Sequence, residues 1–245
     1  MTTVLEIMAN HRSIRSFDKR PVSQEKLEKI IATAQMASTS NFIQAYSVIQ
    51  VTDQEKRKQL AHFSGDQSYV EQAPVFLVFC ADLYRIQQVI EYKGEEANFS
   101  TIESFLLTTI DTALFAQNVM LAAESLGLGG VYIGGIRNQP EQVSEVLDLP
   151  QLVMPLFGMC LGYPAEPIPD QKPRLPLSVV LHQNTYKKEQ LNEIHKYDQE
   201  IGNYYRKRTN GKREDTWSTM MARLFSKPLR KILRTFIEQK HFRLD

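Results

Sequence analysis

Residues 102–135, IESFLLTTIDTALFAQNVMLAAESLGLGGVYIGG, contain the longest apolar stretch of the chain. From residue 102 to 126 apolar side chains occur on every side of a helical projection, and a helix without a polar face is buried in a core or an interface. Three carboxylates, Glu103, Asp111 and Glu124, interrupt this stretch. Because a bilayer penalises buried carboxylates, we predict a core helix rather than a membrane span.

The chain around this helix alternates between strand-like and helix-like segments. Gly127 is placed to end the long helix, and Ser23 and Asp53 are placed to begin two others as N-caps. We expect strands at residues 47–52, 75–80, 131–133 and 152–162, and helices at 23–37, from 53, at 102–126 and at 139–147. Strands and helices that alternate in this way predict an α/β or α+β protein built on one sheet.

The last quarter of the chain has a different character. Residues 163–176 are rich in proline and cannot form a regular helix. From Tyr186 the pattern is helical and polar, with a turn-like interruption at 209–215. From Lys187 onward there are 15 Lys and Arg against 8 Asp and Glu, although the whole chain has a net charge of +1. This basic region suggests a place for an anion; a solvated basic helix face is the alternative.

The two cysteines, Cys80 and Cys160, each lie within an apolar run. Neither has a histidine or a second cysteine at ligand spacing, so we expect two buried, inert thiols and neither a metal site nor a disulfide. Such cysteine usage fits a reducing compartment. The N-terminal residues lack the apolar core of a signal peptide. We therefore expect a cytoplasmic protein.

Two basic segments have the donors that a phosphate requires. His11, Arg12, Ser13 and Arg15 bring two guanidinium groups, a hydroxyl and an imidazole into five residues. The segment 172–176, KPRLP, places two cations on one side of a proline-stiffened chain. Each segment alone is also compatible with a solvated surface turn or loop.

Residues 37–44, ASTSNFIQ, place short hydroxyl side chains next to an aromatic ring. Such hydroxyls favour caps and turns, and Phe42 could lie over a flat ligand. The alternative is a helix end followed by a core phenylalanine.

The glycines of residues 127–135 do not form a dinucleotide fingerprint, because the third glycine position is Tyr132 and the cluster follows a helix. Gly134 and Gly135 still allow a ligand to approach the backbone.

Seven segments in order give a more specific result: HRSIRSF (11–17), ASTSNFIQAYS (37–47), GDQSYVEQA (65–73), LGLGGVYIGGIRN (126–138), PLFGMCLGYPA (155–165), KPRLP (172–176) and RTNGKREDTWS (208–218). Together they resemble the nitroreductase family of flavoproteins, in the branch of NADPH-dependent nitro and flavin reductases. The resemblance covers essentially the whole chain.

The resemblance implies an α+β, nitroreductase-like fold with a mixed central sheet flanked by helices, in an intertwined homodimer. The chain would be one nitroreductase domain, 1–245, with a basic helical C-terminal extension from about 186. The long helix would lie at the dimer interface, which explains its apolar surface. A charge at Ala116, in the middle of this helix, is then expected to disrupt the dimer if that position faces the partner.

The resemblance also assigns roles to single residues. FMN would bind where the two protomers meet. Its phosphate would contact the two basic segments, and Arg15 would lie beside the reduced ring. Further residues would contact the ring from the same chain and from the opposite chain. The implied FMN-binding residues are His11, Arg12, Ser13, Arg15, Ser38, Thr39, Ser40, Gln67, Tyr69, Tyr132, Ile133, Gly134, Gly135, Lys172 and Arg174. Thr39 stands where the family pattern has serine, and it keeps the hydroxyl.

Arg208 and Arg213 correspond to arginines that hold the 2′-phosphate of NADPH, and Phe42, Lys227 and Arg230 to the substrate mouth. Hydride transfer would take place at N5 of the flavin without a catalytic side chain, and NADPH and the acceptor would use one site in turn, in a ping-pong mechanism. Nitro compounds, free flavins and quinones are the expected acceptors, and neither nucleic acid nor a membrane is an expected partner. A flavin store or sensor without nicotinamide-dependent turnover is the alternative.

Overall fold

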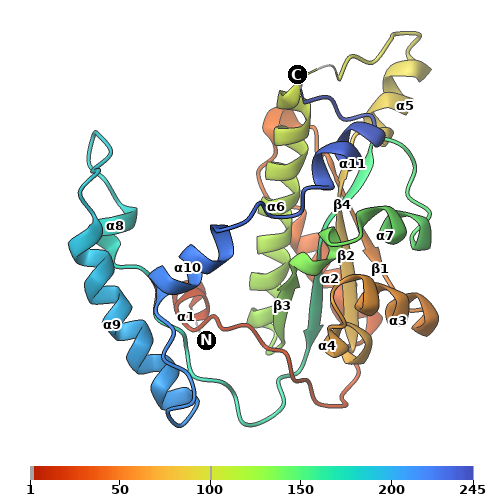
Figure 1. Cartoon of the computed structure of the whole chain (residues 1–245). Helices are drawn as coiled ribbons and strands as arrows, with labels where there is room; N and C mark the ends of the chain where they lie inside the picture. Colours follow the sequence, from red (N-terminus) through yellow and green to blue (C-terminus); the bar gives the residue numbers. More distant parts are fainter. Residues whose placement is uncertain (1–2, 100, 245) are drawn as a thin grey trace. The chain divides into compact units, whose positions relative to one another are not determined.

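The computed structural model describes residues 3–99 and 101–244. The chain divides into two compact units (Figure 1). The first unit comprises Met1–Ile168 together with Ile232–Asp245, and the second comprises Pro169–Lys231. The chain therefore leaves the first unit, builds the second, and returns to the first for its last residues.

A four-stranded sheet forms the centre of the first unit. Its strands are β1 (Tyr46–Gln50), β2 (Val75–Asp82), β3 (Gly129–Ile133) and β4 (Val153–Gly162), in the order β1-β2-β4-β3. All three neighbouring pairs are antiparallel. The α+β class is confirmed, but the predicted mixed sheet is wrong for these described strands. The reason is that β2 and β3, which run in the same direction, are not neighbours, because β4 lies between them and is antiparallel to both.

Helices cover both faces of this sheet. Successive side chains of a strand point to opposite faces. Leu77 and Phe79 of β2 therefore pack with α2 (Gln24–Ala34) and α6 (Ile102–Ser125), whereas Phe76 and Val78 pack against the opposite layer. That layer contains α3 (Gln54–Phe63), α4 (Ser68–Gln72) and α7 (Pro140–Val146). Every residue of β2 is buried, as the continuous apolar run predicts.

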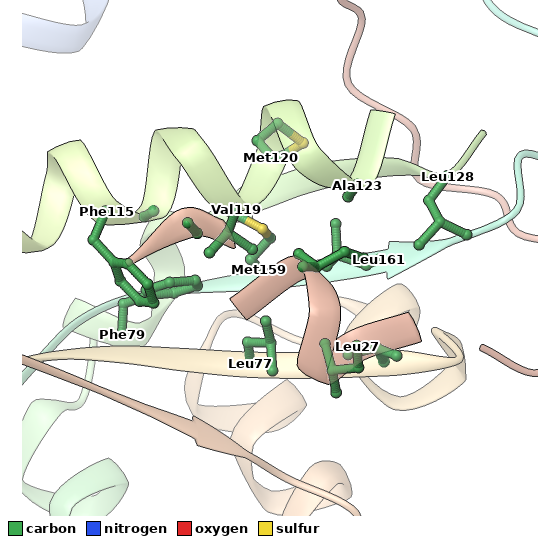
Figure 2. Close-up of a cluster of buried hydrophobic side chains, with 14 of the residues drawn as sticks. Leu27, Leu77, Phe79, Phe115, Val119, Met120, Ala123, Leu128, Met159 and Leu161 are labelled. Carbon is green, nitrogen blue, oxygen red and sulfur yellow. The ribbon is translucent and has the colours of Figure 1, made fainter. Parts of the chain in front are cut away.

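The long helix α6 is a core helix, as predicted. Phe115, Val119 and Met120 lie over the side chains of the sheet (Figure 2). The ring of Phe115 stacks on Tyr46 at 4.3 Å between ring centroids. Length and composition alone would allow α6 to cross a membrane, but it packs on the chain's own sheet. Ala116 is also fully buried in this core, so the condition on which its expected effect on the dimer depended, that it faces a partner, is not met.

The predicted helix boundaries are confirmed to within a few residues. Ser23 and Asp53 cap α2 and α3 by accepting from the N–H groups of Lys26 and Lys56. Gly127, with φ of +78°, follows the end of α6 as expected. The remaining elements of the first unit are α1 (Val4–Ala9), α5 (Tyr84–Tyr92), α11 (Leu233–Gln239) and two 3₁₀ turns, Ser40–Phe42 and Gly134–Arg137.

The C-terminal segment is anchored to the first unit. Phe236, Ile237 and Phe242 are buried in a cluster with residues of the sheet and its connections. Lys240 is also buried, and its Nζ donates to the carbonyl oxygens of Leu149 at 2.7 Å and Pro150 at 2.9 Å.

The second unit is helical, with α8 (Leu177–Val180), α9 (Leu191–Arg208) and α10 (Trp217–Phe225). The predicted interruption separates α9 from α10, and Asn210 and Gly211 there have positive φ. Tyr197, Ile201 and Tyr205 of α9 form its small core.

Candidate functional site

The segment from His11 to Arg15 follows α1 and lies along the edge strand β3. The N–H of Ile14 donates to the carbonyl oxygen of Gly130 at 2.9 Å. The Ile14 side chain is buried against Gly129, where an added Cβ would lie 2.5 Å from Ile14 Cγ1. The half-buried Ser13 and the exposed Arg15 flank this anchor.

Arg12 lies on the same side as Ile14. Its Nε donates to the Asn10 carbonyl oxygen at 3.1 Å. Together with Glu124 and Leu128, these residues line a cavity of about 330 Å³ in the first unit.

His11 is held by a carboxylate that sequence reasoning did not select. Its Nδ1 lies 2.6 Å from Oε1 of Glu124, which is in the last turn of α6. The other oxygen of Glu124, Oε2, is buried and has no hydrogen-bond partner within the described residues. A buried carboxylate requires hydrogen bonds or an opposite charge, so this contact fixes the imidazole. The sequence signal was an acidic residue near the end of an apolar helix.

The structure brings together three predicted ring contacts: Gln67, Tyr69 and Gly135. The Tyr69 hydroxyl donates to Oε1 of Gln67, and Nε2 of Gln67 donates to the Ser64 carbonyl oxygen at 2.5 Å. A Cβ at Gly135 would lie 2.2 Å from that same Ser64 oxygen and 2.5 Å from Nε2 of Gln67. Glycine is therefore required at 135 for the Gln67 side chain to occupy this position.

Tyr132, Ile133 and Gly134 lie at the end of β3 and the start of the following turn. The Tyr132 hydroxyl donates to Oε1 of Gln117 at 3.2 Å, and burial, with a smaller effect of the Glu124 charge, raises the pKa of Tyr132. Ile133 is fully buried. An added Cβ at Gly134 would find its nearest neighbour 3.7 Å away, so the backbone there is open to a ligand.

The loop with the predicted residues Ser38, Thr39 and Ser40 is held by Asp111 of α6. The Ser40 N–H donates to Oδ1 of Asp111 at 3.0 Å, and the Ala45 N–H donates to Oδ2 at 3.4 Å. Asp111 is 1% exposed. Sequence reasoning used this residue to exclude a membrane span and missed its role in the loop.

Between these two anchors the backbone has an unusual shape. Asn41, Phe42 and Gln44 all have positive φ, a region that side-chain-bearing residues rarely adopt. The Phe42 ring is 82% exposed. The alternative of a core phenylalanine is therefore wrong, and the ring is available to a flat ligand.

In the second unit, Lys172 contacts Tyr205 of α9. Its Nζ donates to the Tyr205 hydroxyl at 2.7 Å. Arg174 Nη1 donates to the carbonyl oxygen of Lys172 at 3.0 Å.

Arg208 and Arg213 lie at opposite ends of the turn after α9, and each contacts a tyrosine of that helix. Arg208 Nη1 donates to the Tyr204 hydroxyl at 2.7 Å. The Arg213 guanidinium lies 4.0 Å from the centre of the Tyr205 ring, and its Nε donates to Asp215. The hydrogen bond to Arg213 lowers the pKa of Asp215, and the same bond raises that of Arg213. Lys172 and Arg213 thus share one tyrosine.

Lys227 and Arg230 follow α10. Arg230 has a φ of +42°. Their assignment to a substrate mouth stays a prediction.

The predicted residues thus fall into sets within each unit. In the first unit these are the His11–Arg15 segment, the Gln67, Tyr69 and Gly135 cluster, and the loop on Asp111. In the second unit it is the set of cations on the tyrosines of α9.

Comparison with known proteins gives consistent matches. Residues 8–163 match the nitroreductase family, and residues 172–245 match the nitroreductase family C-terminal domain. The chain is 46% identical over 247 residues to an FMN reductase (NADPH) of Bacillus subtilis, covering 99% of each chain. It is 43% identical to an oxygen-insensitive NADPH nitroreductase of Salmonella typhimurium, covering 98% of each.

Solved structures agree with these matches. The NfrA1 nitroreductase from B. subtilis superposes with a TM-score of 0.94 at 46% identity, covering 97% of this chain and 98% of that one. The NADPH:FMN oxidoreductase from Vibrio harveyi, complexed with NAD⁺, superposes with a TM-score of 0.89 at 41% identity, covering 97% of each. On this similarity of sequence and fold, the chain belongs to the nitroreductase family.

Proposed function

We propose that this chain is an FMN-dependent oxidoreductase that takes hydride from NADPH and reduces nitro compounds, free flavins or quinones. Its similarity over nearly the whole chain to an FMN reductase (NADPH) and an NADPH nitroreductase carries the proposal. The structure supplies the cations and the open backbone that such a reaction needs.

The residues present fit FMN. In the first unit Arg12 and Ser13 offer forked and hydroxyl donors for a phosphate, and in the second unit Lys172 offers an ammonium group. Gly134 leaves the backbone open to a flat ring, and the side chain of Gln67 lies against Gly135, the next residue in the sequence. When bound, FMN supplies hydride transfer at N5, while the protein supplies position and charge.

Arg15 is proposed to stabilise the reduced cofactor. It is exposed next to the buried anchor Ile14, so its guanidinium is free to approach a ligand while its backbone is fixed. A cation that already lies where negative charge develops lowers the energy of the reduced, negatively charged flavin, because the protein does not have to rearrange when the charge appears.

Arg208 and Arg213 are proposed to bind the 2′-phosphate of NADPH. Guanidinium groups are suited to phosphate because their planar donors bind two oxygens at once. Contacts with Tyr204 and Tyr205 hold both groups in place before a ligand arrives. Phe42, Lys227 and Arg230 are proposed to border the acceptor.

A homodimer is proposed as the working form. Four residues of α6 at a spacing of four, Ile102, Leu106, Ile110 and Leu114, form one apolar stripe, and each is between 44% and 56% exposed. A second copy would cover this stripe, since obligate interfaces are apolar. In such a dimer the loop Ser38–Ser40 would reach the flavin of the partner. We also propose that the two units act as one functional domain. The proposed location of the protein is the cytoplasm.

The decisive experiment is on the purified chain. Denaturation is expected to release FMN, NADPH to bleach the bound flavin, and a nitro acceptor or free flavin to restore its colour. Initial rates should give parallel double-reciprocal lines, because both substrates use one site in turn. FAD in place of FMN, or no flavin after reconstitution, would contradict the proposal. Bound FMN that NADPH does not reduce would instead indicate a store or sensor.

A further inference from the structure

Three tyrosines of α9 hold the proline-rich segment that contains Lys172. The Tyr197 hydroxyl donates to the Pro173 carbonyl oxygen at 3.0 Å, and the Tyr204 hydroxyl donates to the Asp170 carbonyl oxygen at 3.3 Å. The Tyr205 hydroxyl differs, because it accepts a hydrogen bond from the ammonium group of Lys172. Tyr205 thus holds the side chain of a predicted phosphate ligand, whereas the other two hold backbone.

The Tyr205 ring is fixed. It is 7% exposed and forms the core of the second unit with Tyr197 and Ile201. Tyr204 contacts it edge to face, at 5.3 Å between ring centroids. A group bound to this ring therefore has a defined position.

Arg213 is bound to the same ring. Its guanidinium carbon lies 4.0 Å from the ring centre, a distance at which a cation is attracted by the electron density of the face. Its backbone is tied to the same residue through Thr209, which donates its hydroxyl to the Tyr205 carbonyl oxygen at 2.7 Å and accepts the Arg213 N–H at 3.0 Å.

We propose that Tyr205 is a positioning residue for both cofactors, its hydroxyl orienting Lys172 for the flavin phosphate and its ring orienting Arg213 for the 2′-phosphate of NADPH. This inference rests on the proposed function. The hydroxyl occupies one of the three donors of the Lys172 ammonium and leaves two for a phosphate. The ring leaves the edge of the Arg213 guanidinium available for a second anion.

The two roles can be separated by substitution. Tyr205→Phe removes the hydroxyl and keeps the ring, so it is expected to weaken FMN binding to the apoprotein about 3- to 10-fold. The preference for NADPH over NADH should remain. Tyr205→Leu removes the ring as well, and it is expected to lower the preference for NADPH over NADH by a factor of about 3 to 10. FMN affinity is measured by quenching of flavin fluorescence, and nicotinamide preference by the ratio of the two kcat/KM values.

Tyr163 provides a matched control. In the first unit its hydroxyl accepts from Lys26 Nζ at 2.6 Å, and the Arg20 guanidinium lies 4.0 Å from its ring centre. The chemistry is the same, but no cofactor contact is predicted for Lys26 or Arg20. Tyr163→Phe and Tyr163→Leu are expected to leave FMN affinity and nicotinamide preference within about twofold of the wild type.

Double variants decide whether Tyr205 acts through the two cations. In a Lys172→Met background, Tyr205→Phe should not weaken FMN binding further, and in an Arg213→Ala background Tyr205→Leu should not change the nicotinamide preference further. Additive effects in both backgrounds would overturn the inference. So would a wild-type FMN affinity in Tyr205→Phe together with a wild-type nicotinamide preference in Tyr205→Leu. Those results would leave the proposed function intact, whereas a wild type without FMN binding or NADPH preference would refute the function itself.

Discussion

Replacement of Asp111 should loosen the loop that carries Phe42 without dismantling the core. The carboxylate accepts two backbone N–H groups, from Ser40 at 3.0 Å and Ala45 at 3.4 Å. Asp111→Ala leaves both donors without this acceptor, and a buried unsatisfied group costs about 1–3 kcal/mol. Because the Ser40 bond is partly buried and can be replaced by water, we expect a loss of about 2–4 kcal/mol in the free energy of unfolding.

Asp111→Asn gives a graded test of the same contact. The amide keeps one acceptor oxygen but turns an NH₂ group toward the second donor. The shorter Ser40 bond should retain the oxygen, so the variant loses the Ala45 bond and about 1–2 kcal/mol. Urea denaturation followed by far-UV circular dichroism measures both losses.

The location of the effect distinguishes this contact from general damage to the core. Amide hydrogen exchange is expected to increase at residues 40–45 in both Asp111 variants, and KM for the acceptor to rise more than kcat falls. Thr112→Val is the control, since the Thr112 hydroxyl is buried on the same helix but donates to Thr108 and Cys80 carbonyl oxygens. It should lower stability without faster exchange in the loop. Wild-type stability and exchange in Asp111→Ala would refute the reasoning.

Other parts of the structure lead to four further predictions. In steady-state kinetics, Arg208→Ala and Arg213→Ala should each raise KM for NADPH about 10- to 100-fold and leave KM for NADH nearly unchanged. If both variants keep the wild-type preference for NADPH over NADH, the assignment of these arginines to the 2′-phosphate is wrong. Ile110→Glu, in the centre of the exposed stripe of α6, should give monomers that lose FMN in sedimentation experiments, and a yellow, active wild-type monomer would rule out the dimeric site. Burial raises the pKa of both Cys80 and Cys160 to about 12, from 9.0, so a thiol reagent at pH 8 should label neither until urea unfolds the chain. Because the folded state keeps protons that the unfolded state releases, the free energy of unfolding should fall as pH rises from about 9 to 12, and a flat profile there would contradict this burial effect.

The fold could be predicted where local pattern decides it. The apolar run of α6 specified a buried helix, and Ser23 and Asp53 marked the start of helices because caps act on N–H groups within three residues. The order and direction of the strands could not be predicted in the same way. The position of β4 between β2 and β3 depends on pairing between segments far apart in sequence, which periodicity does not encode. For the same reason the apolar surface of α6 did not reveal that Ala116 faces its own core.

The candidate site shows the same division. Donor-rich segments such as His11–Arg15 could be found because their chemistry is concentrated in a few residues. The side chains that hold these segments could not be found from the sequence. Glu124 contacts His11 although the two residues are more than a hundred positions apart in the sequence, and Asp111 contacts Ser40 across some seventy positions. The exposure of Phe42 depends on positive φ values in its loop, and no side-chain pattern in that segment specifies them.

The return of the chain to the first unit has a consequence for the order in which the protein matures during synthesis. Phe236, Ile237 and Phe242 complete a cluster whose other members, such as Met154, are translated some eighty residues earlier. A nascent chain that ends within the second unit therefore exposes apolar surface on the first, and that surface is covered only after the segment from Ile232 onward has been translated. A chain truncated after Lys231 should consequently be prone to aggregation and dependent on chaperones, although every predicted cofactor ligand precedes the truncation.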